Sequence, residues 1–426
     1  MERYYVSMEQ HGSWVPVGTI EGEDSYSARF AYSARYRERP DAAAVSVRLP
    51  LQEEPFSPAA TRIFFEGLLP EGFTRRAVAE WMRADEDDYL AILHGLGREC
   101  LGALLISRPG DPLQAGYERI SHAQVRALAE EGATRSAELV TRAHLSLTGA
   151  SGKVGLYYDP DENCWYLPHG TAPSTHIVKQ SHIRLRDIVT NEQLIQMTAA
   201  RCGLDVPESF IVNTGAGADG DVLLATARFD RRFPEEPVLI DGLPRPLRLH
   251  QEDLAQALGI PAARKYERSP EEGYLRAVFE LLRRVSSNPI EDQLKFWDRL
   301  VFNYLAGNTD AHLKIFSLLY GPGGREIRLA PAYDQLSTAV YESSTRDMAF
   351  SIGGDTRLEA IGRGSFARAA AQVGLSSRLA LARFDRLAEH FVPALRASAQ
   401  ELSSLGFPAA GRLEERILRA GGIARL

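Results

Sequence analysis

Several features that would place this chain in a class at once are scarce or absent. Its 426 residues include three cysteines, Cys100, Cys164 and Cys202, which are far apart and form no CxxC pair. A disulfide framework or a cysteine-rich metal site is therefore not expected, and a reducing cytoplasm is the simplest location. No apolar run approaches the roughly 18 residues that a membrane span needs, and the first residues contain no signal-peptide core. We expect a cytoplasmic protein that contacts no membrane.

A surplus of positive charge is also missing. Lys and Arg number 49 and Asp and Glu number 56, which gives a formal net charge of −7. This balance disfavours a chain that binds nucleic acid through a broad basic face of its own. The hydrophobic fraction of 44% and the charged fraction of 25% are ordinary for globular proteins. The length favours two or three domains.

Three ranges of the chain show different patterns. Residues 1–110 combine short strand-like and helical segments and predict a small α/β subdomain. Residues 111–235 are mainly strand-like, and residues 236–426 show the apolar spacing of helices. A β-rich lobe followed by a helical lobe is the order found in protein kinases. We therefore predict an α+β, two-lobed kinase-like fold with a small N-terminal α/β subdomain.

A glycine-rich turn, Ser146-Leu-Thr-Gly-Ala-Ser-Gly-Lys153, lies between two strand-like segments. Backbone N–H groups in such a turn can approach a phosphate, and Lys153 adds positive charge. The turn is not a Walker A loop, because Leu147 stands where its first glycine would be and Val154 where its Ser or Thr would be. Taken alone, an ordinary β-hairpin turn with an exposed lysine explains the segment at least as well.

Lys179 ends another strand-like segment, where a period of two places it on one face with Ile177. A lysine on an apolar face needs an anion, from a carboxylate or from a nucleotide phosphate. Glu192 is the candidate partner, as in the Lys–Glu ion pair of protein kinases, because it lies early in a helix expected over residues 191–202 with Thr190 as its N-cap. The alternative is that Lys179 reaches water at the strand end while Glu192 merely suits the helix dipole.

The strongest signal is the segment Gly307-Asn-Thr-Asp-Ala-His-Leu-Lys314, which follows a helix predicted over residues 291–306. A second aspartate, Asp334, follows a short strand predicted over residues 326–329. Two aspartates on neighbouring loops suit phosphoryl transfer, because Asp310 would accept a hydroxyl proton and Asp334 would hold magnesium. A helix cap and a turn are the structural alternative. The helix itself is expected to bury an apolar stripe of Phe296, Trp297, Leu300, Val301 and Tyr304.

Two other motifs are weaker. Gly215-Ala-Gly-Ala-Asp-Gly220 matches GxGxxG, but a strand-like segment rather than a helix follows it, so we interpret it as a hairpin turn. Asp310 and His312 with Asp334 could also form the metal cluster of a hydrolase. Only one histidine lies in that cluster, which disfavours this alternative.

Taken in order, these segments resemble the HipA-type toxin kinases of bacterial toxin–antitoxin modules over nearly the whole chain. The matching segments are Phe64–Gly72 and Gly97–Ala103 in the N-terminal subdomain, Thr175–Lys179, Ala227–Arg232, Gln251–Asp253 and Lys265–Glu267 in the kinase core, and Asn308–Lys314 and Pro331–Asp334 in the catalytic and metal loops.

The resemblance implies a role for each matching residue. Lys179 would hold the nucleotide phosphates, Asp310 would be the catalytic base with His312 beside it, and Asp334 would bind magnesium. The other ATP-binding positions would be Thr148, Gly149, Ala150, Ser151, Gly152 and Lys153 in the glycine turn, Ala227, Arg228 and Phe229 at a hinge that meets adenine mostly through backbone groups, and His312, Lys314 and Tyr333.

Ser146 matches the serine on which such kinases autophosphorylate, a modification that ejects the glycine turn and inactivates the enzyme. A phosphate there would add about two negative charges beside a site built for anions. An electrostatic off-switch at Ser146 is therefore physically reasonable.

One residue departs from the family pattern. Ile315 stands where the family has an asparagine that binds magnesium, and isoleucine offers no oxygen to this ion. Water, Asn308 or another group takes its place, or the chain transfers phosphate poorly. The last possibility keeps open a nucleotide-binding pseudokinase that binds its antitoxin without productive transfer. The acidic hinge residue of some relatives is also absent at Ala227, which backbone contacts to adenine would tolerate.

The resemblance further implies partners and cofactors. ATP and Mg²⁺ would be required, and a HipB-like helix-turn-helix antitoxin would be the protein partner. Operator DNA would be bound only through the complex with that antitoxin. The protein substrate would belong to the translation machinery, as an aminoacyl-tRNA synthetase specific for glutamate.

Overall fold

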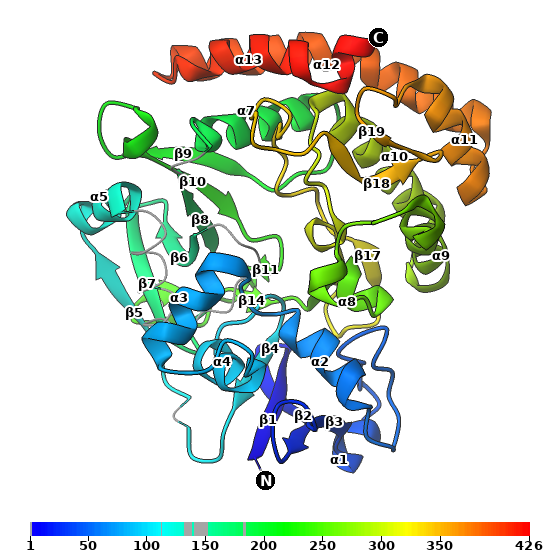
Figure 1. The fold of residues 1–426 in the computed structure, drawn as a ribbon. Coiled ribbons are helices and arrows are strands. Elements are labelled where there is room, and N and C mark those ends of the chain that lie inside the picture. Colours follow the sequence, from blue (N-terminus) through cyan, green and yellow to red (C-terminus); the bar gives the residue numbers. More distant parts are fainter. Residues whose placement is uncertain (1, 112, 132–138, 140–151, 182–184) are drawn as a thin grey trace. The chain divides into compact units, whose positions relative to one another are not determined.

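The computed structural model describes residues 2–111, 113–131, 139, 152–181 and 185–426. The chain divides into two compact units (Figure 1). The first unit comprises Met1–Gln180, Ala225–Ala262 and Leu318–Ile327, and the second comprises Ser181–Leu224, Ala263–Ser317 and Arg328–Leu426. Each unit therefore combines separate stretches of sequence. The finer division into domains over residues 1–110, 111–235 and 236–426 stays a prediction.

The first unit begins with an antiparallel sheet in the order β3-β2-β1-β4. Alternate residues of β1, including Tyr4, Val6 and Met8, are buried, because successive side chains face opposite sides of a strand. His11 and Gly12 join β1 to β2 with positive φ angles of 49° and 81°, as a two-residue hairpin turn requires. The strands are β1 (Glu2–Gln10), β2 (Ser13–Gly22), β3 (Arg29–Tyr32) and β4 (Leu104–Ser107).

Four helices of the first unit follow in sequence between β3 and β4. Ser57 starts α2 by accepting the N–H of Ala60 at 3.2 Å, and Pro58 suits the first helical position. Phe65 of α2 packs on Phe30 of β3, with ring centroids 5.3 Å apart. The helices are α1 (Ala34–Arg37), α2 (Pro58–Glu66), α3 (Gly72–Met82) and α4 (Tyr89–Leu96).

A second antiparallel sheet of this unit contains the strands predicted for the β-rich range. Its order is β5-β7-β6-β8, and the end of β10 continues it beside β8. The strands are β5 (Ala115–Ile120), β6 (Lys153–Asp159), β7 (Cys164–Gly170), β8 (His176–Gln180) and β10 (Val222–Ala227). The strand-like segment that precedes the glycine-rich turn lies outside the described residues.

Shorter elements complete the first unit. They are α5 (His122–Glu131), β11 (Arg231–Arg232), β12 (Leu239–Ile240), β13 (Leu243–Pro244), β14 (Leu247–Arg248), β15 (Gln251–Asp253) and α8 (Leu254–Leu258). The strands β16 (Ser317–Tyr320) and β17 (Ile327–Leu329) lie where the chain passes between the units.

The second unit is mainly helical. Helix α12 contacts α7, α10, α11 and α13, and α10 also packs on α9. Its elements are α7 (Ile188–Arg201), β9 (Ser209–Asn213), α9 (Tyr274–Val285), α10 (Pro289–Ala306), β18 (Asp347–Ile352), β19 (Asp355–Arg357), α11 (Arg363–Val373), α12 (Ser377–Ser404) and α13 (Ala409–Ala420). None of the described helices combines the length and apolar character of a transmembrane segment.

Helix α10 is the core element that leads into the predicted catalytic loop. Asn288 accepts the N–H of Glu291 at its start, Pro289 is its first residue, and Gly307 ends it with a φ of +70°. Every residue of the predicted apolar stripe is buried: Phe296, Trp297, Leu300, Val301 and Tyr304.

One local prediction is wrong. Helix α7 starts at Ile188, so Thr190 is a buried residue inside its first turn and not its N-cap. Tertiary contacts hold this end instead, because the amide of Asn191 donates to Ser337 O at 2.8 Å and accepts the N–H of Ser337 at 3.0 Å. The GxGxxG segment lies between β9 and β10, as the hairpin interpretation predicts.

Candidate active site

Two lysines of the first unit lie at directly opposite positions of neighbouring strands. In the antiparallel ladder of β6 and β8, Lys153 pairs with Lys179 and Val154 with Val178. Both lysines are half-buried, while Val178 on the other face of β8 is buried. Opposite residues have Cβ atoms about 5 Å apart, and like charges at such positions repel each other. An anion with more than one negative charge is therefore the ligand that best matches this pair.

The other residues of the predicted phosphate loop give less information. Ser146, Thr148, Gly149, Ala150 and Ser151 lie outside the described residues. Gly152 is buried directly before β6. Glu192 is buried in α7 of the second unit, and its pairing with Lys179 stays a prediction.

The structure disfavours a contact between the Arg228 side chain and adenine at the predicted hinge. Its N–H donates to Thr175 O at 2.9 Å, and its carbonyl accepts the N–H of Arg231 at 3.2 Å. Its guanidinium is fully buried and pairs with Asp230 at 2.8 Å and Glu99 at 3.2 Å. A contact between this segment and adenine is therefore expected from the backbone of Ala227 and Phe229 rather than from Arg228.

In the second unit, the loop after α10 presents one side chain to solvent. From Phe296 to Leu318 every residue is buried except Asp310. The Oδ1 atom of Asn308 accepts the N–H of Asp310 at 3.2 Å, and the Oγ1 atom of Thr338 accepts the N–H of Thr309 at 2.7 Å. The loop is thus fixed by its buried polar neighbours while the Asp310 carboxylate stays accessible.

The predicted metal loop is tied to this catalytic loop. Asn308 donates from Nδ2 to Asp334 O at 3.5 Å, and the Tyr333 hydroxyl donates to Lys314 O at 3.0 Å. Asp334 has a φ of +55°, which is uncommon for a residue other than glycine and is found at functional turns. The buried Arg299 of α10 donates to the carbonyl of Ala330 at the start of the same loop.

His312 is buried, and its burial and the nearby Lys265 lower its pKa to about 3. The ring is therefore neutral near pH 7. Its Nδ1 atom accepts the N–H of Lys314 at 3.2 Å, which places the ring proton on Nε2. A neutral, fixed imidazole suits a structural or positioning role beside Asp310 better than proton transfer.

The donor set around Asp334 suits magnesium only in part. Ile315 is 6% exposed and supplies no oxygen. The Oδ1 atom of Asn308 accepts one hydrogen bond, from the N–H of Asp310, and Nδ2 donates to Asn303 and Asp334, so this side chain is held within the loops. In contrast, Oε1 of the buried Gln335, next to Asp334, has no hydrogen-bond partner among the described residues. One carboxylate with amide oxygens and water fits this ion, which keeps several waters in most protein sites.

Tyr266 is a site residue whose role the sequence does not indicate. Its hydroxyl donates a hydrogen bond to Oδ1 of Asp310. The sequence does show the segment Lys265–Glu267 as a match to the family, but no periodicity or spacing connects it with a residue 44 positions later.

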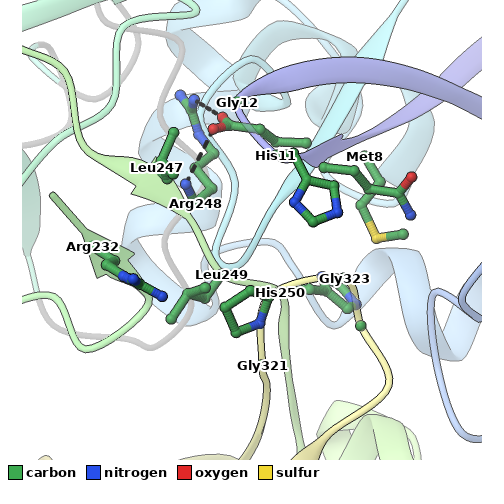
Figure 2. Close-up of a pocket in the computed structure, with 14 residues that line it drawn as sticks. Met8, His11, Gly12, Arg232, Leu247, Arg248, Leu249, His250, Gly321 and Gly323 are labelled. Carbon is green, nitrogen blue, oxygen red and sulfur yellow. Dashed lines mark hydrogen bonds and ion pairs between the residues drawn. The ribbon is translucent and has the colours of Figure 1, made fainter. Parts of the chain in front are cut away.

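A separate hollow lies in the first unit (Figure 2). It is bordered by the turn between β1 and β2, by β14 and by the segment Gly321–Gly324, and the His11 side chain lies beside it. Among the residues predicted to bind ATP, none of those that the structure describes lines this hollow. It is therefore distinct from the predicted site.

Comparison with known proteins shows which family and which relatives this chain resembles. The family described as HipA-like C-terminal domain matches residues 145–395, and HipA N-terminal domain matches residues 11–107. Y4mE of Sinorhizobium fredii, whose name describes it as a candidate kinase, is 34% identical over 392 residues, with 88% of each chain covered. The Shewanella oneidensis protein named serine/threonine-protein kinase toxin HipA is 28% identical over 346 residues, covering 78% of this chain and 76% of that protein.

A solved structure is similar over almost the whole length. It is titled as a complex of Shewanella oneidensis HipA, HipB and operator DNA, and it aligns with a TM-score of 0.78 at 23% identity, covering 97% of each chain. This likeness confirms the α+β fold that the sequence predicts, and both of the relatives named above are called kinases. The chain belongs to the HipA family of toxin kinases.

Proposed function

We propose that this chain is an ATP- and Mg²⁺-dependent serine/threonine protein kinase and the toxin of a toxin–antitoxin module. The observation that carries this proposal is Asp310, the single exposed residue in an otherwise buried and internally bonded stretch from Phe296 to Leu318. An accessible carboxylate on a fixed loop is what a base for a substrate hydroxyl requires.

Each predicted residue has a part in this reaction. Lys153 and Lys179 bind phosphate oxygens of ATP, and Asp334 holds the metal ion. Bound Mg²⁺ would neutralise part of the phosphate charge. Asp310 takes the proton of a Ser or Thr hydroxyl, whose oxygen forms a bond to the γ-phosphorus while ADP leaves with its oxygen. His312 stays neutral and orients the loop.

The partners follow from the family and not from the site residues. The relative from Shewanella oneidensis carries the name of a Ser/Thr kinase toxin, and the similar solved structure holds an antitoxin and operator DNA. We propose a HipB-like antitoxin for this chain, with DNA contacted through that complex. The proposed substrate is a glutamate-specific aminoacyl-tRNA synthetase, and Ser146 is the proposed site of autophosphorylation.

Intact-mass measurement after incubation with ATP and Mg²⁺, with and without the purified synthetase, tests the proposal. Wild type is expected to gain a phosphate on Ser146 or to transfer it to the synthetase, and Asp310→Ala is expected to do neither. Asp347→Ala is the matched control, because Asp347 is another exposed aspartate of the second unit. The absence of phosphate on both proteins with wild type would contradict a kinase.

A pseudokinase is the second candidate, because Ile315 supplies no oxygen where the family resemblance places a metal ligand. This alternative predicts that ATP raises the melting temperature while no phosphate is transferred. Transfer that occurs only in Ile315→Asn would establish it. A metal hydrolase would instead release phosphate without modifying a protein, would lose this activity on chelation, and would tolerate Lys179→Ala.

A further inference from the structure

Tyr266 contacts two side chains of the predicted catalytic loop, those of Asp310 and His312. Its hydroxyl donates to Oδ1 of Asp310, and its ring meets the His312 ring edge-on, with centroids 5.0 Å apart and an interplanar angle of 89°. The Lys265 ammonium group lies 5.6 Å from the centroid of the Tyr266 ring. A cation at the ring face draws electron density from the phenol, which favours donation by its hydroxyl.

The residues on both sides of Tyr266 are held in place. Hydrogen bonds to the backbone of three other segments fix them, so the backbone that carries Tyr266 is held next to the Asp310 loop. Lys265 O accepts the N–H of Leu313 at 3.2 Å, Oε1 of Glu267 accepts the N–H of Tyr274 at 2.8 Å, and Oε2 of Glu267 accepts the N–H of Ser351 at 2.6 Å.

We propose that Tyr266 is a positioning residue for phosphoryl transfer, which holds Oδ1 of Asp310 so that Oδ2 faces the hydroxyl of the protein substrate. This inference rests on the proposed function. An exposed carboxylate can turn about its Cβ–Cγ bond, and a hydrogen bond to one of its oxygens restricts this rotation. A hydroxyl that donates to a carboxylate forms a strong, charge-assisted hydrogen bond and selects one orientation.

Tyr266→Phe tests this role, because it removes the hydroxyl and keeps the ring against His312. We expect the maximum rate of phosphoryl transfer to fall about 10- to 100-fold, as a misplaced reacting group does. The ATP concentration at half-maximal rate should stay within about twofold of wild type, since no ATP-binding residue changes. The assay uses whichever substrate wild type modifies, Ser146 or the synthetase, with ATP varied.

Tyr274→Phe is the matched control. It also removes a tyrosine hydroxyl of the same region, one that donates to Arg264 O at 2.8 Å and not to Asp310. This variant should keep the wild-type rate while losing similar stability. A wild-type rate in Tyr266→Phe, or an equal loss of rate in both variants, would overturn the positioning role.

A second measurement decides the contact without any activity. In protein labelled with ¹³C at the tyrosine Cζ atoms, the resonance that is missing from Tyr266→Phe identifies Tyr266. This resonance should shift in Asp310→Asn, and an unchanged resonance would overturn the contact. If wild type transfers no phosphate, the proposed function fails and the catalytic role fails with it, while the resonance still decides whether Tyr266 holds Asp310.

Discussion

Asp310 and Ile315 lie on the same loop, but the charged side chain is exposed to solvent and the apolar side chain is buried. Asp310 is exposed, so water solvates its charge, whereas Ile315 is only 6% exposed and suits its apolar surroundings. An asparagine at position 315 would bury an amide that needs a metal ion or a hydrogen bond to compensate it. At the scale of the residue, we therefore expect Ile315 to give a more stable loop in exchange for the magnesium ligand that the family resemblance places here.

The variant Ile315→Asn should reverse this exchange. Without magnesium, we expect its free energy of unfolding to fall by about 1–3 kcal/mol, because a polar group replaces a buried apolar one. With ATP, it should need several-fold less Mg²⁺ for half-maximal phosphoryl transfer. Urea unfolding and a Mg²⁺ titration measure the two effects. Ile315→Val, which adds no ligand, should leave the Mg²⁺ requirement unchanged, and an unchanged requirement in Ile315→Asn would contradict the argument.

Glu252 of the first unit predicts a pH dependence of stability. Its carboxylate accepts bonds from Ser46 Oγ at 2.6 Å and Val47 N at 2.9 Å, yet burial raises its pKa to about 7. Because the folded pKa lies above the unfolded one, Glu252 contributes fully below about pH 4.5, and this contribution is lost as the pH rises through about 7. Relative to wild type, Glu252→Gln should gain up to about 3 kcal/mol of unfolding free energy between about pH 5 and pH 8.

Urea unfolding at several pH values checks this expectation. The exposed Glu53 supplies the control, since Glu53→Gln should follow the wild-type curve at every pH. If the free energy of unfolding depends on pH in the same way for wild type and Glu252→Gln, the pKa of Glu252 is not raised in the folded protein and the prediction is wrong.

At the scale of the element, the sequence predicts what local patterns encode. Helix α10 carries its apolar stripe at a spacing near 3.6, and Asn288, Pro289 and Gly307 mark its ends. The start of α7 has no such signal, because Asn191 is bonded to Ser337, 146 positions away. Helix α12 continues through Pro393 to Ser404, since burial of residues on both sides of Pro393 offsets the cost of an internal proline.

The same distinction between local sequence patterns and contacts of distant segments applies to the candidate site. The loops with Asp310 and Asp334 could be predicted, because each carries a cluster of polar residues after a predicted helix or strand. The contacts within the site could not be predicted, since they join segments distant in sequence. Tyr266 with Asp310 and Thr309 with Thr338 are examples, and no period or spacing of residues encodes such pairs.

The end of α10 gives a prediction at this scale. Gly307 has a φ of +70°, and a Cβ atom there would lie 2.7 Å from Ala339 Cβ and 3.0 Å from Gly421 Cα. Gly307→Ala should therefore lower the free energy of unfolding by more than the roughly 1 kcal/mol that left-handed strain costs, and should reduce phosphoryl transfer by shifting the Asp310 loop. Thermal unfolding and the transfer assay measure both.

Gly374 is the matched control for this prediction. It ends α11 in the same left-handed conformation, but a Cβ atom there would meet only the end of the Arg283 side chain, at 3.6 Å. Gly374→Ala should show the strain alone and keep the transfer rate. Equal losses of unfolding free energy and of transfer rate in both variants would mean that the close approach of Ala339 and Gly421 to position 307 has no effect.

At the scale of the whole chain, a buried ionic cluster crosses the boundary between the two family descriptions. Glu99 belongs to the N-terminal match, residues 11–107, and it pairs with Arg228 at 3.2 Å, with Arg231 at 2.8 Å and with Arg248. All four side chains are at most 2% exposed. Although burial opposes ionisation, the three guanidinium groups hold the pKa of Glu99 at about 2. The cluster is therefore charged near pH 7.

The N-terminal range should consequently not be separable from the rest of the first unit. Glu99→Gln should lower the free energy of unfolding by about 3–5 kcal/mol, since it removes the buried carboxylate that three buried guanidinium groups share and leaves them with the carboxylates of Asp230 and Glu9. Glu21→Gln, at the exposed pair with Arg3, should cost less than about 1 kcal/mol.

By the same argument, a chain of residues 111–426 should show neither cooperative unfolding nor an ATP-dependent rise in melting temperature. Cooperative unfolding with nucleotide binding in that fragment would mean that the rest of the first unit tolerates these arginines without Glu99, and the N-terminal range would then be an independent domain.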